Sequence, residues 1–316
     1  MSTVETTTPS QPCIVAGFDN SPSGFDAVAL GRQLAVATAS RLVVATVYPL
    51  NVLGATAVTF DAHVADVMYE DALRTVERAR IVLEGFEDWD TVAYAAVPAA
   101  RGLHELAERH GAEMIVVGST HRHGLGRVMP GTTAEKLLHG SGVPIVVAPA
   151  GWRGSELGTI GVGFDGSGES SAALHAAGTL AKIARTRLLA LSVFEAPNPA
   201  NPVYAVTSHG YTEIMGELRE ACRRRLEEAA ETLPTGCEHT TAVVDGDPVD
   251  VLAEASGRLD LLVIGSRGYG AAHATLAGTV GHRLATASRC PLMLVPRGVE
   301  QPLHGIVPRT RHHAKH

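Results

Sequence analysis

Short apolar runs alternate with longer stretches of mixed polarity along the chain, and this pattern predicts strands separated by helices. In the first half we expect strands at Cys13–Phe18, Leu42–Val47, Thr91–Val97, Met114–Val117 and Ile145–Ala148. We expect a helix after Ser21 and Ser23, a long one from about Asp61 to Leu83, one over Arg101–His110 ended by Gly111, and one from Thr132. Short, continuously apolar strands separated by helices form parallel sheets covered on both faces, so the predicted fold class is α/β.

The whole pattern occurs twice. IVAGFDNSPSG at 14–24 returns as IGVGFDGSGES at 160–170, and MIVVGS at 114–119 returns as LLVIGS at 261–266. Asp19 and Asp165 are 146 residues apart, whereas Gly118 and Gly265 are 147 apart, so one residue is inserted before the fourth strand of the second copy. The second set of predicted strands is Ile160–Phe164, Leu188–Val193, Thr241–Val244, Leu261–Ile264 and Leu292–Val295. We therefore expect two copies of one domain, at 12–151 and 158–298, between flexible tails at 1–11 and 299–316.

Composition and charge narrow the function classes. The 316 residues include 45% hydrophobic residues, enough for two buried cores. A net charge of −7 and only 4% aromatic residues argue against nucleic-acid binding. No apolar run is long enough to span a membrane, the N-terminus lacks a secretory pattern, and the four cysteines show no paired spacing. We therefore expect a cytoplasmic protein without membrane contact.

A glycine-rich segment follows the fourth predicted strand of the second copy. Its spacing is G-x2-G-x9-G-T, with Gly265, Gly268, Gly278 and Thr279. The first two glycines let the backbone approach a ligand closely. The last two residues open the next helix, whose free N–H groups favour a phosphate. We favour a phosphate site here over an ordinary flexible loop.

The first copy departs from this spacing at one position. Gly118, Gly131 and Thr132 keep their places, but His121 stands where the second copy has Gly268. A side chain there would crowd a nucleotide or require another backbone angle, while Gly124 and Gly126 give compensating freedom. His121 and its neighbour His123 alone make a weak metal site, so we interpret them as surface histidines and expect no metal.

Asp19 and Asp165 end the first strand of each copy, in the sequence GFD. At the carboxyl end of a parallel strand, an aspartate can accept hydrogen bonds from ribose hydroxyls or an adenine amino group. An Asx turn or a helix cap explains the same residue equally well. Both interpretations stay open from the sequence. No acid–base or nucleophile pair with a positioned partner is visible, so we predict no catalytic residue.

Together these features resemble the universal stress protein family, in its tandem-domain form common in actinobacteria, over roughly 12–150 and 159–297. The resemblance implies two Rossmann-like, adenine nucleotide alpha hydrolase-like domains, each with a five-stranded parallel sheet in the order 3-2-1-4-5. It implies that the glycine loop binds ATP, with or without magnesium, and that domains pair through their fifth strands. We therefore expect an internal pseudo-dimer of the two copies and a homodimer of chains.

The nucleotide-binding residues that we predict combine the loop positions with those that the resemblance adds. In the first copy they are Gly17, Asp19, Val47, Gly118, Ser119, Gly124, Gly131, Thr132 and Thr133. In the second copy they are Gly163, Asp165, Val193, Gly265, Ser266, Arg267, Gly268, Gly270, Gly278, Thr279 and Val280. Val47 and Val193 are also consistent with plain core positions.

The function predicted on this basis is that of an ATP-binding stress-response regulator or sensor. Two alternatives stay open. One is a slow ATP-hydrolysing or nucleotidyl-transferring enzyme of a related fold. The other is an interaction module that works without nucleotide.

Overall fold

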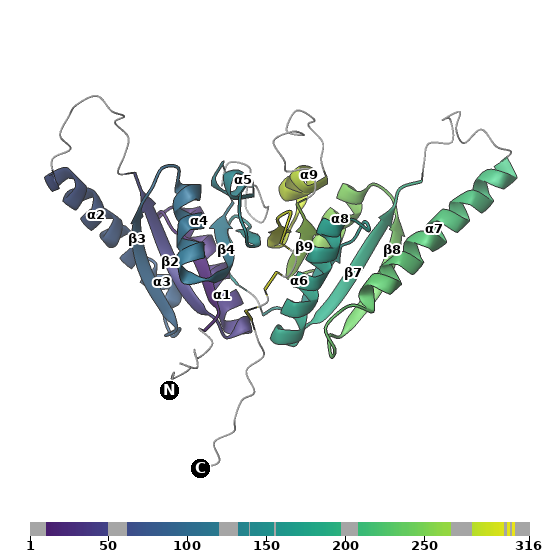
Figure 1. Cartoon of the computed structure of the whole chain (residues 1–316), viewed down its shortest axis with the longest axis horizontal. Helices are drawn as coiled ribbons and strands as arrows, with labels where there is room; N and C mark the ends of the chain where they lie inside the picture. The colour runs from purple at the N-terminus through teal and green to yellow at the C-terminus, as the bar shows by residue number, and fades with distance from the viewer. Residues whose placement is uncertain are drawn as a thin grey trace, which may run out of the picture.

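The computed structural model describes residues 11–49, 62–119, 132–138, 140–154, 156–196, 208–266, 280–299, 302–303 and 305–306. In the first half, strands and helices alternate along the chain, as the apolar pattern predicts (Figure 1). The elements of this half are β1 (Cys13–Gly17), α1 (Pro22–Thr38), β2 (Arg41–Tyr48), α2 (Ala62–Glu77), α3 (Arg80–Leu83), β3 (Trp89–Ala95), α4 (Ala99–His110), β4 (Ala112–Gly118), α5 (Thr132–Leu138) and β5 (Ile145–Ala148).

The second half repeats this order of elements, except that one helix, α7 (Ser208–Ala230), stands in place of α2 and α3. Its elements are β6 (Thr159–Gly163), α6 (Gly168–Ala184), β7 (Arg187–Phe194), α7, β8 (His239–Asp245), α8 (Pro248–Ser256), β9 (Leu261–Gly265), α9 (Val280–Ala287) and β10 (Leu292–Val295). The strands run in the order β3-β2-β1-β4-β5 in the first half and β8-β7-β6-β9-β10 in the second. All neighbours within each half are parallel, and each half has the expected order 3-2-1-4-5.

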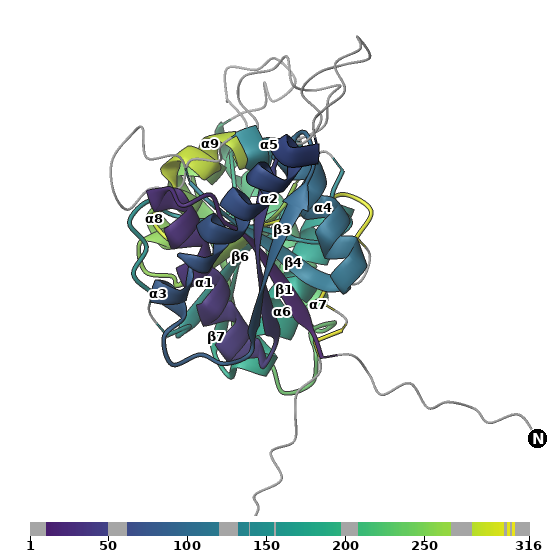
Figure 2. The ribbon, with the colours of Figure 1, turned by 90° about the vertical axis from the view of Figure 1, so that its left-hand side faces the viewer.

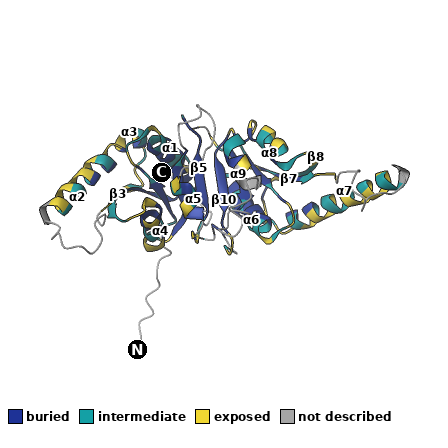
Figure 3. Ribbon diagram, turned by 90° about the horizontal axis from the view of Figure 1, so that it is seen from above, coloured by how far each residue is buried: buried dark blue, intermediate teal, exposed yellow. Residues whose placement is uncertain are grey.

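The two halves join through their fifth strands. β5 and β10 pair in antiparallel fashion, with Val146 opposite Met293, so the two sheets form one ten-stranded sheet. Every residue of these two strands is fully buried. Figure 3 shows β5 and β10 side by side at the centre of the molecule, with α2 and α7 at its two ends. The internal pairing through the fifth strands is thus present within a single chain.

Helices cover both faces of the sheet, and each face has its own apolar core. α1, α2, α3, α6 and α7 pack on one face through residues such as Leu30, Val76 and Leu180. α4, α5, α8 and α9 pack on the other face through residues such as Leu106 and Leu284. Figure 2 looks onto the outer end of the first half, where α1, α2 and α3 lie together. No helix in the described ranges is both long and apolar enough to cross a membrane.

The ends of the helices follow from local chemistry. Ser21 caps α1, because its hydroxyl accepts a hydrogen bond from the N–H of Gly24 at 3.1 Å, and Pro22 has the backbone angle that suits a first helical residue. Gly111 ends α4 in the left-handed conformation, with φ of 58°. The corresponding Gly257 after α8 is right-handed instead, with φ of −70°. The inserted residue of the second copy therefore lies where the helix ending changes.

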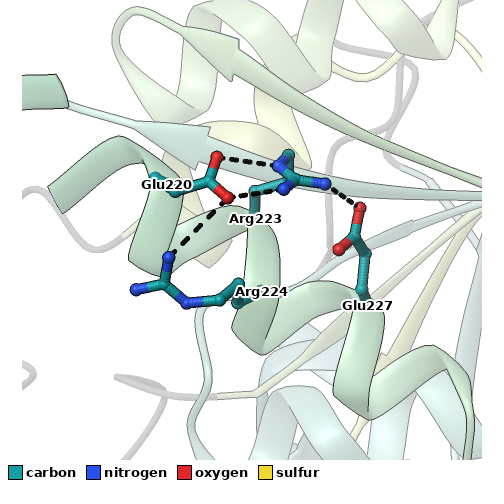
Figure 4. A network of polar contacts seen from close by, with 4 residues as sticks. All are labelled: Glu220, Arg223, Arg224 and Glu227. Atoms are coloured by element: carbon teal, nitrogen blue, oxygen red, sulfur yellow. Dashed lines mark hydrogen bonds and ion pairs between the residues drawn. The ribbon is translucent and has the colours of Figure 1, made fainter. Parts of the chain in front are cut away.

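α7 extends to one end of the molecule, where much of its surface is exposed (Figure 3). Arg223 forms ion pairs with Glu220 and Glu227 along this helix, and Arg224 lies 3.7 Å from Glu220 (Figure 4). Pairs at this helical spacing stabilise a helix locally, although each exposed pair contributes little to folding. They help to explain how α7 keeps its helical form where the sheet does not cover it.

Two features differ from the sequence prediction. The expected helix from about Asp61 to Leu83 is divided into α2 and α3. Val76 and Ala79 are both fully buried, and the N–H of Ala79 bonds the carbonyl of Val76 in a tight turn that points both inward.

The second difference concerns the C-terminus, where we expected a loose tail from residue 299. Leu303 is only 1% exposed and Ile306 only 3%, and both belong to the core that includes α1 and α6. Gly305 lies against the Glu113 side chain at the start of β4. The apolar residues of this segment are buried because they pack onto the folded halves. The sequence did not predict this packing, because the residues that follow have a basic character.

Candidate functional site

The order of the strands predicts a ligand-binding crevice in each half. β1 lies between β2 and β4, and β6 lies between β7 and β9. The chain leaves β1 towards β2 on one side and later returns to β4 on the other, so the connections diverge at the carboxyl ends of β1 and β4. Ligands of parallel α/β sheets bind at such points. Asp19 and Gly118 belong to this edge in the first half, and Asp165 and Gly265 belong to it in the second.

Asp19 and Asp165 form the same turn in both halves. Asp165 Oδ1 accepts hydrogen bonds from the Ser167 N–H at 2.9 Å and from the Ser167 hydroxyl at 2.5 Å. Asp19 Oδ1 accepts the same two bonds from Ser21, at 3.0 Å and 2.5 Å. These are Asx turns that lead into the caps of α1 and α6. Both carboxylates are nevertheless exposed, so the turn and a contact with a ligand are compatible.

Gly118 and Gly265 allow close packing between a strand end and a helix start. A Cβ atom on Gly118 would lie 1.9 Å from the carbonyl oxygen of Ser23, in the first turn of α1. A Cβ atom on Gly265 would lie 2.6 Å from the carbonyl carbon of Glu169, in the first turn of α6. Their contact with a ligand stays a prediction, and in the structure the group that approaches each glycine is the backbone of a helix. They therefore fix the distance between the two sides of the crevice.

The residues that the family resemblance added pack against side chains of the core. A Cβ atom on Gly17 would lie 3.1 Å from Leu103, and one on Gly163 would lie 3.2 Å from Leu252. Val47 packs against α4, because a Cβ atom on Gly102 would lie 2.7 Å from its Cγ1 atom. Val193, like Val47, is half-buried beside the same core. Their positions are those of core residues at the carboxyl edge of the sheet.

The glycine-rich segment after the fourth strand of each half is termed the signature loop. Its start is described in both halves, and so is the helix that follows it. Ser119 and Ser266 are buried, and their N–H groups bond Ala148 and Val295 on the neighbouring strands. Thr132 is exposed and begins α5, with Thr133 after it, while Val280 begins α9. The predicted residues Gly124, Gly131, Arg267, Gly268, Gly270, Gly278 and Thr279 lie outside the described residues, as do His121 and His123.

The helix that follows the signature loop in the second half is tied to its neighbour. Arg283 of α9 lies 3.4 Å from the carboxylate of Asp247, which caps α8. The N–H of Asp250 hydrogen-bonds this carboxylate and lowers the pKa of Asp247, and Arg283 lowers it further. This link, which the sequence analysis did not identify, connects α9 with the start of α8. Because an arginine and an aspartate 36 residues apart are common in any sequence, nothing in the sequence marked them as a pair.

A second feature that sequence reasoning missed is Arg225 of α7. Its side chain lies over the turn after β6, where a Cβ atom on Gly166 would be 2.7 Å from Arg225 Cδ. Gly166 has φ of 81° and Asn20, its counterpart in the first half, has φ of 60°. The turn beside Asp165 therefore has an arginine next to it.

Within the described ranges, no group of three or more His, Cys, Asp or Glu side chains is placed to bind a metal ion. The described polar groups at this edge are an exposed carboxylate in each half and the start of the helix that follows each loop. A carboxylate can accept bonds from hydroxyl or amino groups, and free N–H groups at a helix start can bind an anion.

Comparison with known proteins gives the same family for both halves. A sequence model of the universal stress protein family matches residues 13–149 and 156–296. Universal stress protein YxiE of Bacillus subtilis is 30% identical over 141 residues, which cover 42% of this chain and 95% of that protein. A universal stress protein of Mycolicibacterium smegmatis is 30% identical over 190 residues, which cover 58% of this chain and 62% of that protein.

The fold has the same relatives. The crystal structure of a universal stress protein from Archaeoglobus fulgidus aligns with a TM-score of 0.61 at 18% sequence identity, over 90% of this chain and 96% of that one. At this identity the likeness concerns the fold alone. Because the family model matches both halves, the chain belongs to the universal stress protein family and contains two copies of its domain.

Proposed function

We propose that this chain binds ATP in the crevice of its second half and acts as a nucleotide-responsive regulator or sensor in a stress response. The observation that carries the proposal is the G-x2-G-x9-G-T spacing of Gly265, Gly268, Gly278 and Thr279. This segment starts at the end of β9 and leads into α9, at the edge where parallel sheets bind ligands. The start of α9 would take the phosphates through its free N–H groups.

The described residues around the loop support this assignment. Gly265 contacts the first turn of α6, and Asp165 lies in the turn that precedes the same helix. The Asp165 carboxylate is exposed and oriented by Ser167. An oriented acceptor beside a phosphate-binding loop suits the ribose or adenine end of the same molecule. Magnesium would accompany the phosphates as part of the bound nucleotide.

The first half is the weaker candidate. It has the same turn at Asp19, the same close packing at Gly118 and an exposed Thr132 at the start of α5. His121 replaces the second glycine of the loop, and a side chain at this position would crowd a nucleotide. We therefore propose one ATP per chain, bound in the second half.

Titration calorimetry with ATP tests both the ligand and the number of sites. We expect one site per chain. Gly278→Glu should abolish binding, because it places a carboxylate and extra bulk against the phosphates. Gly131→Glu changes the same position of the first half and should leave binding unchanged. If wild-type protein freed of nucleotide binds no ATP, the proposal is wrong; if only Gly131→Glu abolishes binding, the site has been assigned to the wrong half.

Regulation differs from turnover in what happens to the bound nucleotide. We expect ATP released by acid from the complex to be intact after incubation times in which a dedicated ATPase would convert it. Steady release of ADP or AMP, lost in Gly278→Glu, would show an enzyme instead.

A further inference from the structure

A large open cavity lies on the first half, lined by residues of α1 and of the α2–α3 region. Its volume is about 910 Å³, within the range of small-molecule sites. The residues that line it come from the turn after β1, from α1, from the α2–α3 region and from the start of β3. They are Asn20, Phe25, Glu77, Arg78, Arg80, Ile81, Leu83, Glu84 and Trp89.

Near the cavity, the two halves differ in how the helix after the first strand packs. Arg32 of α1 donates hydrogen bonds to the carbonyl oxygens of Val82 at 3.2 Å and Glu84 at 2.9 Å, so its side chain stands between α1 and the α3 region. The residue at the same place in the second half, 146 positions later, is Gly178. A Cβ atom on Gly178 would lie 2.4 Å from Leu233, so the chain packs directly onto α6 there. Arg32 thus acts as a spacer where the second half is closely packed.

The lining of the cavity is largely apolar. Leu83 is buried, and Phe25 and Trp89 are half-buried. Phe25 is held in place by an edge-to-face contact with Phe18, at 5.0 Å between ring centroids. Ile81 belongs to the same lining but is 79% exposed, the highest value among the large apolar residues found exposed in the described ranges. A ligand in the cavity would cover this side chain.

The charges of the lining are balanced. Arg80 pairs with Glu77, and its guanidinium lies 5.1 Å from the centroid of the Trp89 ring. Arg78 and Glu84 contribute one further charge of each sign. Because the two arginines and two glutamates cancel, the cavity favours neither an anion nor a cation through long-range attraction.

We propose that this cavity binds a compact, uncharged and mainly apolar small molecule with an aromatic body. Burial of Ile81, Phe25 and the exposed part of Trp89 supplies the affinity. Aromatic rings prefer the offset and edge-to-face contacts that Phe25 and Trp89 offer. The site lies outside the signature loop, and the inference does not depend on nucleotide binding.

Trp89 gives this site a direct reporter, because the chain has only one other tryptophan, Trp152. The probe is N-phenyl-1-naphthylamine, an uncharged aromatic dye. In the Trp152→Phe variant, Trp89 is the remaining tryptophan. Binding of the dye should quench the emission of Trp89, and the quenching should saturate at one dye molecule per chain. Dye emission measured with the wild-type chain is a second readout, should Trp152→Phe fold poorly.

Two matched variants locate the site. Ile81→Glu should raise the dissociation constant of the dye by about tenfold or more, because it removes apolar contact and places a carboxylate beside the ligand. Val36→Glu introduces the same side chain at a residue of α1 that is 62% exposed and lies outside the lining. It should change the dissociation constant of the dye by less than about twofold. Failure of the dye to bind saturably, or equal weakening by both variants, would overturn the proposal. The proposal would also be overturned if the anionic dye 1-anilinonaphthalene-8-sulfonate bound more tightly than the uncharged dye and lost this binding in Ile81→Glu.

Discussion

Replacing Gly118 with alanine should destabilise the first half through a clash between backbones. The new Cβ atom would lie 1.9 Å from the carbonyl oxygen of Ser23, whereas ordinary contacts begin at 3.4 Å. The first turn of α1 must then move by about 1.5 Å from its packed position. Overpacking of this kind costs about 1–3 kcal/mol, and we expect the upper part of this range because the obstacle is backbone.

Urea denaturation followed by circular dichroism measures this effect. With a urea dependence of about 3 kcal/mol per molar, a loss of about 3 kcal/mol lowers the midpoint by about 1 M. Gly142→Ala is the matched control, because no atom lies within 4 Å of its Cβ position and its φ is not in the left-handed region. We expect its midpoint to change by less than about 0.3 M. Equal midpoints for the two variants would refute the packing role of Gly118.

Three further outcomes are expected. Leu303→Ala should lower the free energy of unfolding by about 2–5 kcal/mol, because the side chain is 1% exposed; a loss below about 0.5 kcal/mol in urea denaturation would contradict the packing of the C-terminal segment. Burial, and then Arg41, lower the pKa of His110, so the unfolded chain binds this proton first as the pH falls. Stability should therefore decrease from pH 7 towards pH 5, and His110→Gln should reduce that decrease; an identical pH dependence in both proteins would argue against it. Burial raises the pKa of Cys290 to about 12, so iodoacetamide at pH 8 should label the half-exposed Cys222 first, as mass spectrometry would show, and earlier labelling of Cys290 would contradict its burial.

The inner strands were predictable because they contain continuous apolar runs that are buried on both faces, whereas the edge strands β3 and β8 have mixed polarity and are partly exposed. Ile145–Ala148 and Leu292–Val295 have the predicted bounds. The break after α2 was not predictable, because Arg78 and Ala79 favour a helix by themselves. The break depends on burial of Ala79 and on the bonds from Arg32 to carbonyl oxygens that follow it, which are contacts distant in sequence.

The candidate site shows a similar limit. The family resemblance implied the strand order 3-2-1-4-5, and the observed pairing of β6 with β9 brings Asp165 and Gly265 to one edge of the sheet. The sequence left the role of Asp165 open between a turn and a ligand contact, and the bonds from Ser167 now establish the turn. A sequence pattern cannot distinguish a glycine that admits a ligand from one that admits a helix, because both need the absence of a Cβ atom. Only the position of Glu169 revealed the packing role of Gly265.

The antiparallel pairing of β5 with β10 has a consequence for how the two halves can differ. Because one polypeptide links the partners, their association does not weaken on dilution. In a symmetric dimer of single domains, every substitution appears in both subunits. Here each half always meets an unlike partner, so His121 can change one loop while the other keeps Gly268. A single chain can thus combine two crevices with different ligand requirements at a fixed ratio of one to one.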